Sequence, residues 1–351
     1  MPIEIKEVSY LYEPGTPMEK EALDHVSLTF YEGQFTALIG HTGSGKSTLI
    51  QLLNGLLKPS EGDVLYNGES IFASVESIEA ELKAGRKMAG LSKSLLSGKR
   101  KRLSKKELRE EKARRMREIR RKVGLVFQYP EHQLFEMTVA DDVAFGPKNL
   151  GLSDEEVNAR VKKALKMVGM DIEEDPALGQ KSPFELSGGQ KRRVAIAGVL
   201  AMEPEFLILD EPTAGLDPKG RDEILGEVAA LRKEQGIAVI LVSHSMEDVA
   251  KFADRIVAVE GGKIVLDGTP REVFSHKELL EKVGLGVPQM TELSAALKER
   301  GFDIPDVLLT QEEVLEAVLP QLKKAGTSAA APAAETDVAA DAAANGREVT
   351  V

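Results

Sequence analysis

The chain has 351 residues, of which 29% are charged and 42% hydrophobic, and its formal net charge is −11 at pH 7. This length is ample for a buried core and suggests two domains, or one domain with additions. The chain has no cysteine, which excludes a disulfide framework, a thiolate metal site and a cysteine nucleophile. No apolar run approaches the roughly 18 residues that span a bilayer, and the first residues do not resemble a secretory signal, so we expect an intracellular protein.

The N-terminal part of the chain has the pattern of strands around one helix. Apolar and polar residues alternate over 3–9 and 26–30, which predicts strands, and the apolar run 35–39 predicts a more buried strand. Helical spacing is found over 46–57, and a short strand is expected at 64–66. A polar helix is expected over 104–121, because the segment is rich in helix-forming residues.

The second half predicts an α/β fold. The continuous apolar runs 206–209 and 238–242 are typical of buried parallel strands, and a helical pattern over 222–234 lies between them. This strand–helix–strand unit has the spacing of a right-handed crossover. Further strands are expected at 123–128 and in a hairpin over 256–266, and helices at 153–168 and 194–202. Two or three short helices are expected over 275–324.

A glycine-rich turn follows the strand at 35–39. The stretch from Gly40 to Ser47 matches GxxxxGK[ST] in full, and it lies between a strand and a helix as the motif requires. The glycines let successive backbone N–H groups point at an anion, and the next helix adds its partial positive charge. Lys46 supplies a cation for the β- and γ-phosphates, and Ser47 a hard oxygen ligand for Mg²⁺. The motif therefore predicts binding of ATP with Mg²⁺.

The apolar strand at 206–209 leads into two carboxylates, Asp210 and Glu211. The carboxyl end of a buried parallel strand is where α/β sheets bind ligands. Asp210 is suited to holding Mg²⁺, and Glu211 to polarising the water that attacks the γ-phosphate. A carboxylate that only caps a turn is the alternative, and the phosphate loop in the same chain weighs against it.

A third motif, Leu186-Ser187-Gly188-Gly189-Gln190, precedes a predicted helix. With it, the chain resembles the nucleotide-binding domain of ATP-binding cassette (ABC) transporters over about residues 3–270. Other markers occur in the family's order: Tyr12, Gln128, Ala214-Gly215-Leu216-Asp217 and His244. The resemblance implies a P-loop NTPase of ABC type, with a RecA-like parallel-sheet core, an N-terminal antiparallel β region, a helical subdomain and a small C-terminal helical extension. It also implies that the chain hydrolyses ATP.

The resemblance assigns roles to individual residues. The catalytic group consists of Glu211, His244 and Gln128, and the Mg²⁺ group of Ser47, Gln128 and Asp210. The nucleotide group comprises Tyr12, Gly40, His41, Thr42, Gly43, Ser44, Gly45, Lys46, Ser47, Thr48, Ser187, Gly188, Gly189, Gln190 and Asp217. Tyr12 is expected to stack on adenine, although Tyr10 competes with it. In the family two such domains bind head to tail, so residues 186–190 would meet the ATP on a second subunit.

Residues 126–149 and 284–293 resemble the ATPase subunits of energy-coupling factor (ECF) importers, which take up vitamins or transition-metal ions. That resemblance implies a second ATPase subunit, a transmembrane scaffold subunit and a substrate-binding membrane subunit as partners. It places the chain at the cytoplasmic face of the cell membrane, in peripheral contact with it. Phe127, Tyr129, Leu134 and Phe135 would be apolar anchors for a scaffold helix, unless they are ordinary core residues.

Two other functions stay open at this point: a soluble ABC ATPase that acts on nucleic acid or the ribosome, and the ATPase of an ordinary ABC transporter. The negative net charge argues against a nucleic-acid partner, and none is expected. One segment is strongly basic although the chain as a whole is acidic, because residues 73–122 hold 18 Lys and Arg and only 7 Asp and Glu. It is a solvated insertion or, as an alternative, a contact with anionic lipid.

The expected domain organisation has three parts. An ABC domain spans 1–270 and contains the basic insertion at about 73–118. A helical segment at 271–326 is expected to help two ATPases associate. The Ala-rich tail at 327–351 has the composition of a disordered segment.

Overall fold

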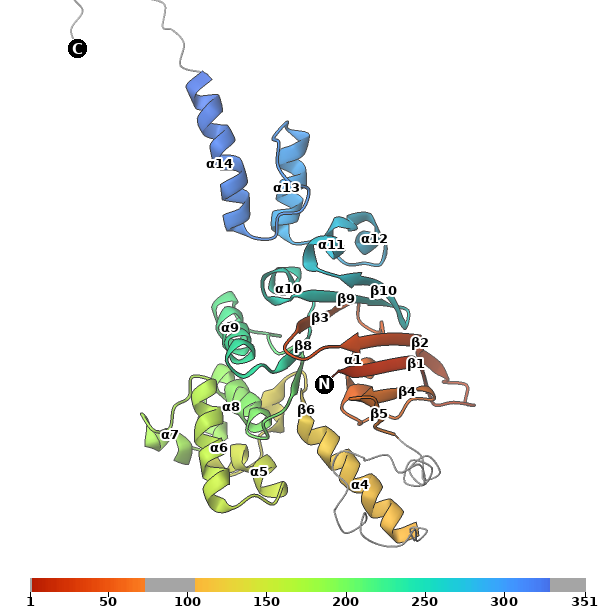
Figure 1. Ribbon diagram of the computed structural model, residues 1–351. Coiled ribbons are helices and arrows are strands. Elements are labelled where there is room, and N and C mark those ends of the chain that lie inside the picture. Colours follow the sequence, from red (N-terminus) through yellow and green to blue (C-terminus); the bar gives the residue numbers. More distant parts are fainter. Residues whose placement is uncertain (1, 73–104, 329–351) are drawn as a thin grey trace, which may run out of the picture.

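The computed structural model describes residues 2–72 and 105–328, and its strands form two sheets (Figure 1). The first sheet is antiparallel, in the order β2-β1-β4-β5, with β1 at Ile3–Tyr12, β2 at Lys20–Phe30, β4 at Glu61–Tyr66 and β5 at Glu69–Ser70. It is the N-terminal β region that the resemblance implied.

The second sheet has the order β10-β9-β3-β8-β7-β6. Its strands are β3 (Phe35–Ile39), β6 (Val123–Val126), β7 (Phe206–Asp210), β8 (Ala238–Val242), β9 (Arg255–Glu260) and β10 (Lys263–Gly268). The five strands from β9 to β6 pair in parallel, and β10 pairs antiparallel with β9 as the predicted hairpin. The predicted α/β fold with a parallel core is confirmed.

Helix α1 (Lys46–Leu53) packs between the two sheets. Its residues Leu49 and Leu52 belong to one buried cluster with Ile3 of the first sheet and Ile240 of the second. The helix ends before the expected residue 57, because Gly55 has φ 72° and turns the chain away. The cluster therefore fixes the start of α1 against the end of β3.

A helical subdomain is built from α5 (Val139–Asn149), α6 (Asp154–Met167), α7 (Pro176–Gln180) and α8 (Gly188–Leu200). Its apolar residues pack in one cluster with β7 and β8. Helix α6 begins with the capping box of Ser153 and Glu156, close to the predicted helix at 153–168. Helix α5 was not predicted, since Gly146 and Pro147 lower the helix propensity of its sequence.

Three further helices adjoin the core sheet. Helix α9 (Pro218–Gln235) connects β7 to β8, and α10 (Met246–Phe252) follows β8. Helix α4 (Lys105–Lys122) leads directly into β6 and confirms the predicted polar helix. The rest of the basic insertion, residues 73–104, lies outside the described residues.

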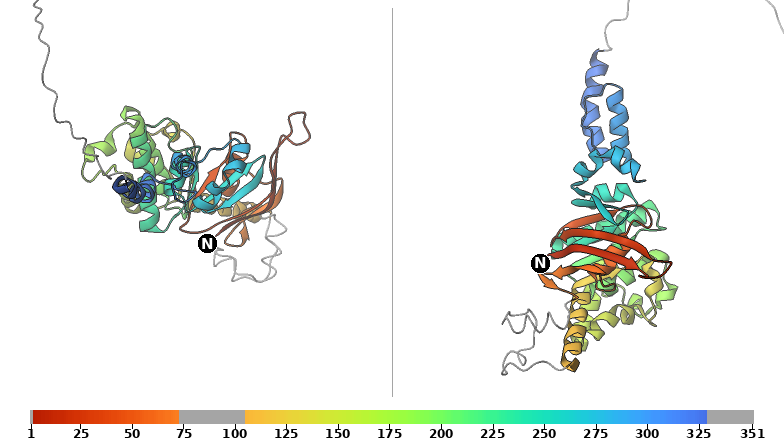
Figure 2. Two further views of the ribbon diagram at one scale, coloured as in Figure 1. Left: turned by 90° about the horizontal axis from the view of Figure 1, so that it is seen from above. Right: turned by 90° about the vertical axis from the view of Figure 1, so that its right-hand side faces the viewer.

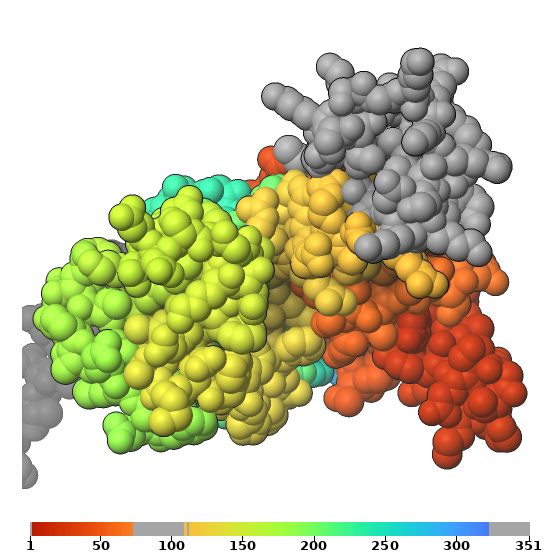
Figure 3. Space-filling model, turned by 90° about the horizontal axis from the view of Figure 1, so that it is seen from below, coloured from red at the N-terminus to blue at the C-terminus, as the bar shows by residue number. Residues whose placement is uncertain are grey.

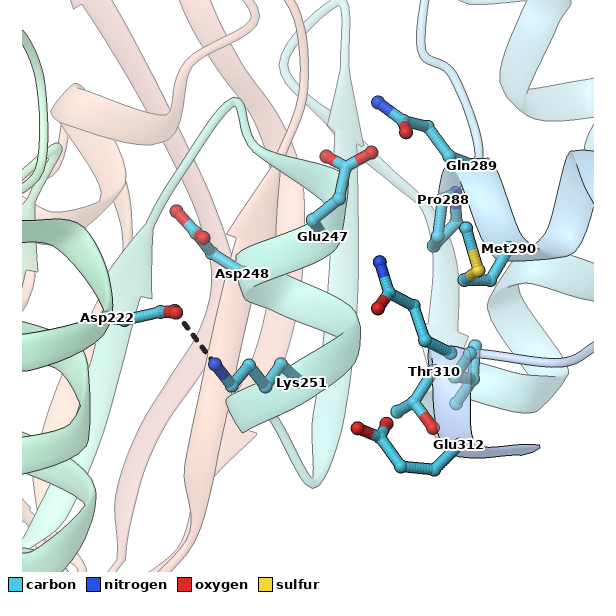
Figure 4. A pocket seen from close by; sticks show the side chains of 11 residues that line it. Asp222, Glu247, Asp248, Lys251, Pro288, Gln289, Met290, Thr310 and Glu312 are labelled. Carbon is cyan, nitrogen blue, oxygen red and sulfur yellow. Dashed lines mark hydrogen bonds and ion pairs between the residues drawn. The ribbon is translucent and has the colours of Figure 1, made fainter. Parts of the chain in front are cut away.

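Four helices follow the sheet over residues 269–328: α11 (Pro270–Ser275), α12 (Lys277–Lys282), α13 (Gln289–Glu299) and α14 (Gln311–Ser328). Helices α13 and α14 lie side by side and project from the core (Figures 1 and 2). A cavity of about 370 Å³ separates their base from α10, and Glu247, Asp248 and Lys251 face it from the core side (Figure 4).

Within the described part of the chain, no helix is long and apolar enough to cross a membrane. The expectation of a disordered tail concerns mainly residues 329–351, which lie outside the described residues. Residues 327 and 328 are still part of α14, so the helix extends beyond the expected boundary at 326.

Candidate nucleotide site

The buried strand β3 leads into the phosphate loop. A Cβ on Gly40 would lie 2.3 Å from the carbonyl oxygen of Val259, and one on Gly45 would lie 2.5 Å from that of Ala22. Gly45 also has φ 111°, so both positions require glycine. His41, Thr42, Gly43 and Ser47 are exposed at the mouth of the loop, whereas Ser44 and Thr48 are buried beneath it. The result is an anion cradle at the N-terminus of α1.

Lys46 is the buried cation of this loop. Its Nζ donates hydrogen bonds to the carbonyl oxygens of Gly40 at 2.7 Å and His41 at 2.9 Å. Burial lowers the pKa of Lys46, while the carboxylates of Glu211, Asp210 and Glu260 act in the opposite direction. The ammonium group is thus held inside the loop, in the place where the motif needs a phosphate-binding cation.

Asp210 is the last residue of β7 and is only 8% exposed. Burial raises the pKa of its carboxyl to about 6, and the charge of Glu211 adds to this, while Lys46 and His244 oppose it. Only Lys46 and His244 favour the charged form of this buried carboxylate, so a bound cation would stabilise it further. Together with the exposed hydroxyl of Ser47, it provides the hard oxygen donors that Mg²⁺ prefers.

The protein alone offers no cage of three or more His, Cys, Asp or Glu residues for a metal in the described residues. This donor set still fits Mg²⁺, which commonly keeps several waters and binds one or two protein groups plus substrate phosphates. The Mg²⁺ assignments of Ser47, Gln128 and Asp210 remain predictions.

The three predicted catalytic residues meet at the carboxylate of one of them, Glu211. Nε2 of Gln128 donates to Oε2 of Glu211 at 2.8 Å, and Nε2 of His244 lies 2.8 Å from Oε1 of the same residue. Gln128 follows β6, Glu211 follows β7 and His244 follows β8, so neighbouring strands of the parallel sheet deliver all three. Glu211 itself has φ 48°, an uncommon conformation for a non-glycine residue.

Tyr12 lies beside the start of α1. Its hydroxyl is 3.0 Å from Oγ1 of Thr48, and its ring packs edge-on against Tyr10 with centroids 4.8 Å apart. Tyr12 is exposed, whereas Tyr10 is partly buried and packs against the core. The geometry therefore favours Tyr12 over Tyr10 as an aromatic surface for a ligand in the loop.

Residues 187–190 form the start of α8 on the helical subdomain. Ser187 caps the helix in a capping box with Gln190, so the hydrogen bonds between them are local. Ser187, Gly188 and Gln190 are exposed. Asp217 similarly caps α9 through a 2.8 Å hydrogen bond from the backbone N–H of Gly220. The structure gives these residues no hydrogen bond to the phosphate loop within the described chain, as expected if they serve a second subunit.

Sequence reasoning missed a buried arginine that joins these segments. Arg192 is 3% exposed, and its guanidinium donates to both carboxylate oxygens of Glu131 and, at 3.0 Å, to the carbonyl oxygen of Ala214. One side chain thus links α8, the loop after Gln128 and the loop before Asp217. The sequence carried no signal for it, because Arg192 stands in a run of three basic residues.

A second missed contact lies at the loop itself. Nε2 of His41 is 2.7 Å from Oε2 of Glu260, at the end of β9. Glu260 adds a negative charge near Lys46 that no motif predicted.

Comparisons with known proteins agree with this geometry. The model of the ABC transporter family matches residues 23–214. An energy-coupling factor transporter ATP-binding protein EcfA2 of Clostridium tetani is 52% identical over 319 residues, covering 91% of this chain and 96% of the relative. The protein of that name from Clostridium acetobutylicum is 51% identical over 325 residues, covering 93% and 99%.

Solved structures lead to the same group. One is cbiO1 from Clostridium perfringens, part of the ABC transporter complex cbiONQ, with TM-score 0.61, 36% identity and coverage of 83% of this chain and 97% of that one. Another is a dimeric bacterial ABC transporter cassette, with TM-score 0.56, 29% identity and coverage of 76% and 98%. This chain belongs to the ABC transporter family, within the group of ATP-binding proteins of energy-coupling factor transporters.

Proposed function

We propose that this chain is one of two ATPase subunits of an ECF-type importer and that it contributes one phosphate loop and one 187–190 segment to a pair of shared ATP sites. As a member of its family the chain is an ATPase whose hydrolysis energises transport. The observation that carries the site assignment is the meeting of Gln128, Glu211 and His244 at one point beside Lys46 and Asp210.

Each residue has a chemical task in this proposal. The backbone N–H groups of the loop and Lys46 bind the phosphates of ATP, and Ser47 with Asp210 would hold Mg²⁺, which supplies charge neutralisation when bound. Glu211 orients the attacking water and accepts its proton. His244 donates a hydrogen bond toward the γ-phosphate. Gln128 couples the binding of that phosphate to the loop that follows Gln128. Tyr12 stacks on the adenine.

The two side-chain contacts of Glu211 compete with an attacking water for its carboxylate oxygens, each of which has two lone pairs. Gln128 and His244 hold one oxygen each. Release of either contact frees an oxygen for water. His244 and Gln128 have polar groups suited to phosphate and Mg²⁺. When nucleotide binds, these side chains would therefore exchange their contacts with Glu211 for contacts with the ligand, and the carboxylate would become available to water.

A second subunit is needed to complete the site. The exposed start of α8 is an N-terminus suited to anions, and it lies on the helical subdomain, with no hydrogen bond to this chain's own loop. A solved cassette 28% identical to this chain is dimeric and bound to ADP and phosphate, which supports a pair of such domains. Residues 271–326, whose α13 and α14 project from the core, are proposed to help hold the pair together.

A groove lies between α4 and the helical subdomain, and it is proposed as the docking groove for the transmembrane scaffold subunit. We define it by its apolar floor and its arginine wall: Leu134, Phe135, Phe145, Leu150, Val199 and Met202, with Arg117, Arg120 and Arg121. Two of the four predicted anchors, Leu134 and Phe135, line this docking groove. Phe127 and Tyr129 are exposed but do not line it.

The transported solute is proposed to be a vitamin or a transition-metal ion, bound by a separate membrane subunit. Peripheral attachment at the cytoplasmic face of the cell membrane is proposed on the same grounds, the docking groove and the ATPase role.

The test is affinity purification of the tagged full-length chain from detergent-solubilised native membranes, with mass spectrometry of what is recovered. The proposal predicts a second ATPase and polytopic membrane proteins. Recovery of ribosomal or nucleic-acid proteins, without a membrane protein, would contradict it.

A further inference from the structure

Arg192 contacts two loops from the helix that carries it. It lies just after the exposed start of α8, and its side chain is 3% exposed. Its Nη2 donates to Oε1 of Glu131 at 3.0 Å and its Nε to Oε2 at 3.3 Å, while Nη1 donates to the carbonyl oxygen of Ala214 at 3.0 Å. All three nitrogens of the guanidinium are therefore engaged, in a geometry that the rigid arginine fork provides.

Glu131 is the charged partner in this contact. It lies in the short 3-10 helix Pro130–Gln133, and its side chain is 20% exposed. Burial acts to raise the pKa of Glu131, but the opposing hydrogen bond and charge of Arg192 contribute to a pKa below the usual value. The carboxylate therefore stays ionised at neutral pH, and a bidentate pair of opposite charges connects α8 to the loop after Gln128.

The two partners of Arg192 lie close in sequence to the catalytic contact. Glu131 comes three residues after Gln128, and Ala214 comes three residues after Glu211. The backbone N–H of Ala214 donates to the carbonyl oxygen of Glu211 at 3.2 Å, and Nε2 of Gln128 donates to Oε2 of Glu211 at 2.8 Å. The contacts thus form a closed circuit, which the guanidinium of Arg192 closes on one side and the Gln128–Glu211 hydrogen bond on the other.

The circuit joins two parts of the molecule. Helix α8 packs with α5 and α6 in the helical subdomain, which forms one side of the molecule next to α4 (Figures 1 and 3). Gln128 and Glu211 instead follow neighbouring strands of the core sheet, β6 and β7. Through Arg192 the subdomain therefore constrains how far apart the ends of these two strands lie.

We propose that Arg192 is a positioning residue for ATP hydrolysis, which acts through Glu131 and Ala214 to hold Gln128 and Glu211 in the arrangement that hydrolysis requires. This inference rests on the proposed function, because it assumes that Glu211 acts on the attacking water. Protein groups occupy the guanidinium, so its role is placement and not proton transfer. Arg192 is on the same helix as the 187–190 segment, so it also relates this chain's contributions to the two shared ATP sites.

Arg192→Lys tests the placement. Lysine keeps a positive charge beside Glu131, but its compact ammonium lacks the fork that contacts the carboxylate and the carbonyl oxygen of Ala214 together. We expect kcat for ATP hydrolysis to fall about tenfold, since misplacing a reacting group by about 1 Å can cost about 100-fold. The KM for Mg-ATP should change little, because the phosphate loop with Lys46 and the ring of Tyr12 are not part of the circuit.

The next residue, Arg193, offers a matched control. Its guanidinium donates to the carbonyl oxygen of Val168 at 2.8 Å and to Glu223 at 3.0 Å, and it also pairs with Glu227. Arg193→Lys thus removes comparable contacts from the same helix and leaves the circuit intact, so its kcat should equal that of the wild type. Both full-length variants are purified with their membrane partners, and their Tm is measured. A loss of kcat in both that follows the loss of Tm would make Arg192 a structural residue and overturn the proposal.

A neutral pair covers the case in which a single substitution leaves a buried charge unpaired. Arg192→Gln/Glu131→Gln removes both charges together, so no buried charge lacks its partner. The shorter glutamine cannot replace both contacts of the arginine fork. The double variant should therefore show a reduced kcat like that of Arg192→Lys, with KM again little changed. A wild-type kcat in the double variant would show that the fork does not position the site.

The absence of cysteine allows a direct measurement of the loop spacing. Nitroxide labels are attached at His132→Cys and Lys219→Cys, two exposed positions beside the two loops, in the full-length chain purified alone. Electron spin resonance should give a narrow distribution of label distances in the otherwise wild-type chain and with Arg193→Lys, and a broader one with Arg192→Lys. An unchanged distribution would contradict the positioning role.

The outcomes separate the two proposals. If the purified wild-type complex does not hydrolyse ATP, or if Glu211→Gln leaves its rate unchanged, the proposed function of the site fails. If the wild type hydrolyses ATP, Glu211→Gln abolishes turnover and Arg192→Lys keeps the wild-type kcat, the proposed function stands and the positioning role of Arg192 is wrong.

Discussion

Nε2 of His244 lies 2.8 Å from Oε1 of Glu211, and this contact joins the ends of two neighbouring strands of the core sheet. The carboxylate that is proposed to polarise water thus contacts the residue that is proposed to contact the γ-phosphate. We propose that the pair acts as a two-position device, in which a bound γ-phosphate competes with Glu211 for His244.

Replacement of His244 by alanine tests its part in that device. We expect His244→Ala to reduce ATP hydrolysis about 100-fold, the range typical of a lost proton-positioning group, and to change Mg-ATP affinity little. His276→Ala is the matched control, because His276 is an exposed histidine far along the chain. Steady-state hydrolysis and Mg-ATP binding, measured on both variants, show whether His244 acts in hydrolysis. A wild-type rate in His244→Ala would make His244 a structural residue.

Tyr12 is predicted to contribute stacking energy to the adenine. Base–aromatic stacking contributes about 1–3 kcal/mol, so Tyr12→Ala should weaken ATP binding about tenfold, while Tyr12→Phe retains most of the affinity. Binding of tripolyphosphate, which lacks the base, should not change. A larger loss of ATP affinity in Tyr10→Ala than in Tyr12→Ala would assign the stacking to Tyr10 instead.

Asp210 predicts a pH dependence of stability in the nucleotide-free protein. Its pKa is about 6 in the folded chain against 3.8 as the ordinary value, so between these values the folded state binds more protons than the unfolded state. The contribution of Asp210 to the free energy of unfolding therefore falls as the pH rises from about 4 to 6. The full difference corresponds to about 3 kcal/mol.

Urea unfolding with a chelator present checks this prediction. The stability of Asp210→Asn relative to the wild type should increase as the pH rises through that window and become constant above about pH 7. A difference between the two proteins that does not depend on pH would show that burial does not raise the pKa of Asp210.

Local sequence patterns were sufficient to predict the phosphate loop, the Asp210–Glu211 strand end and the helix that begins after Ser153. Each of these depends on residues within a few positions of one another, such as Ser153 with Glu156. The parallel sheet could be predicted as well, because strands such as β8 are buried along their whole length and so are continuously apolar.

Contacts between distant segments could not be predicted in this way. Arg192 reaches Glu131 across 61 residues, His41 reaches Glu260 at the end of the neighbouring strand β9, and neither pair has a sequence signature. The docking groove is a similar case. Leu134 and Phe135 were expected to anchor a partner, but the arginine wall depends on how α4 packs, and that packing is decided by Met116 and Ile119 on its other face.

The central claim is that Glu211 drives ATP hydrolysis in this chain, and Glu211→Gln tests it most directly. The amide keeps the size of the side chain and one acceptor oxygen but cannot accept the proton of water. Steady-state hydrolysis and Mg-ATP binding are measured side by side on the wild type and the variant, each purified with its membrane partners. We predict that hydrolysis on this chain's site falls at least about 100-fold, with Mg-ATP affinity retained and the nucleotide-bound pair of ATPases stabilised. Turnover at the wild-type rate at that site would contradict the account.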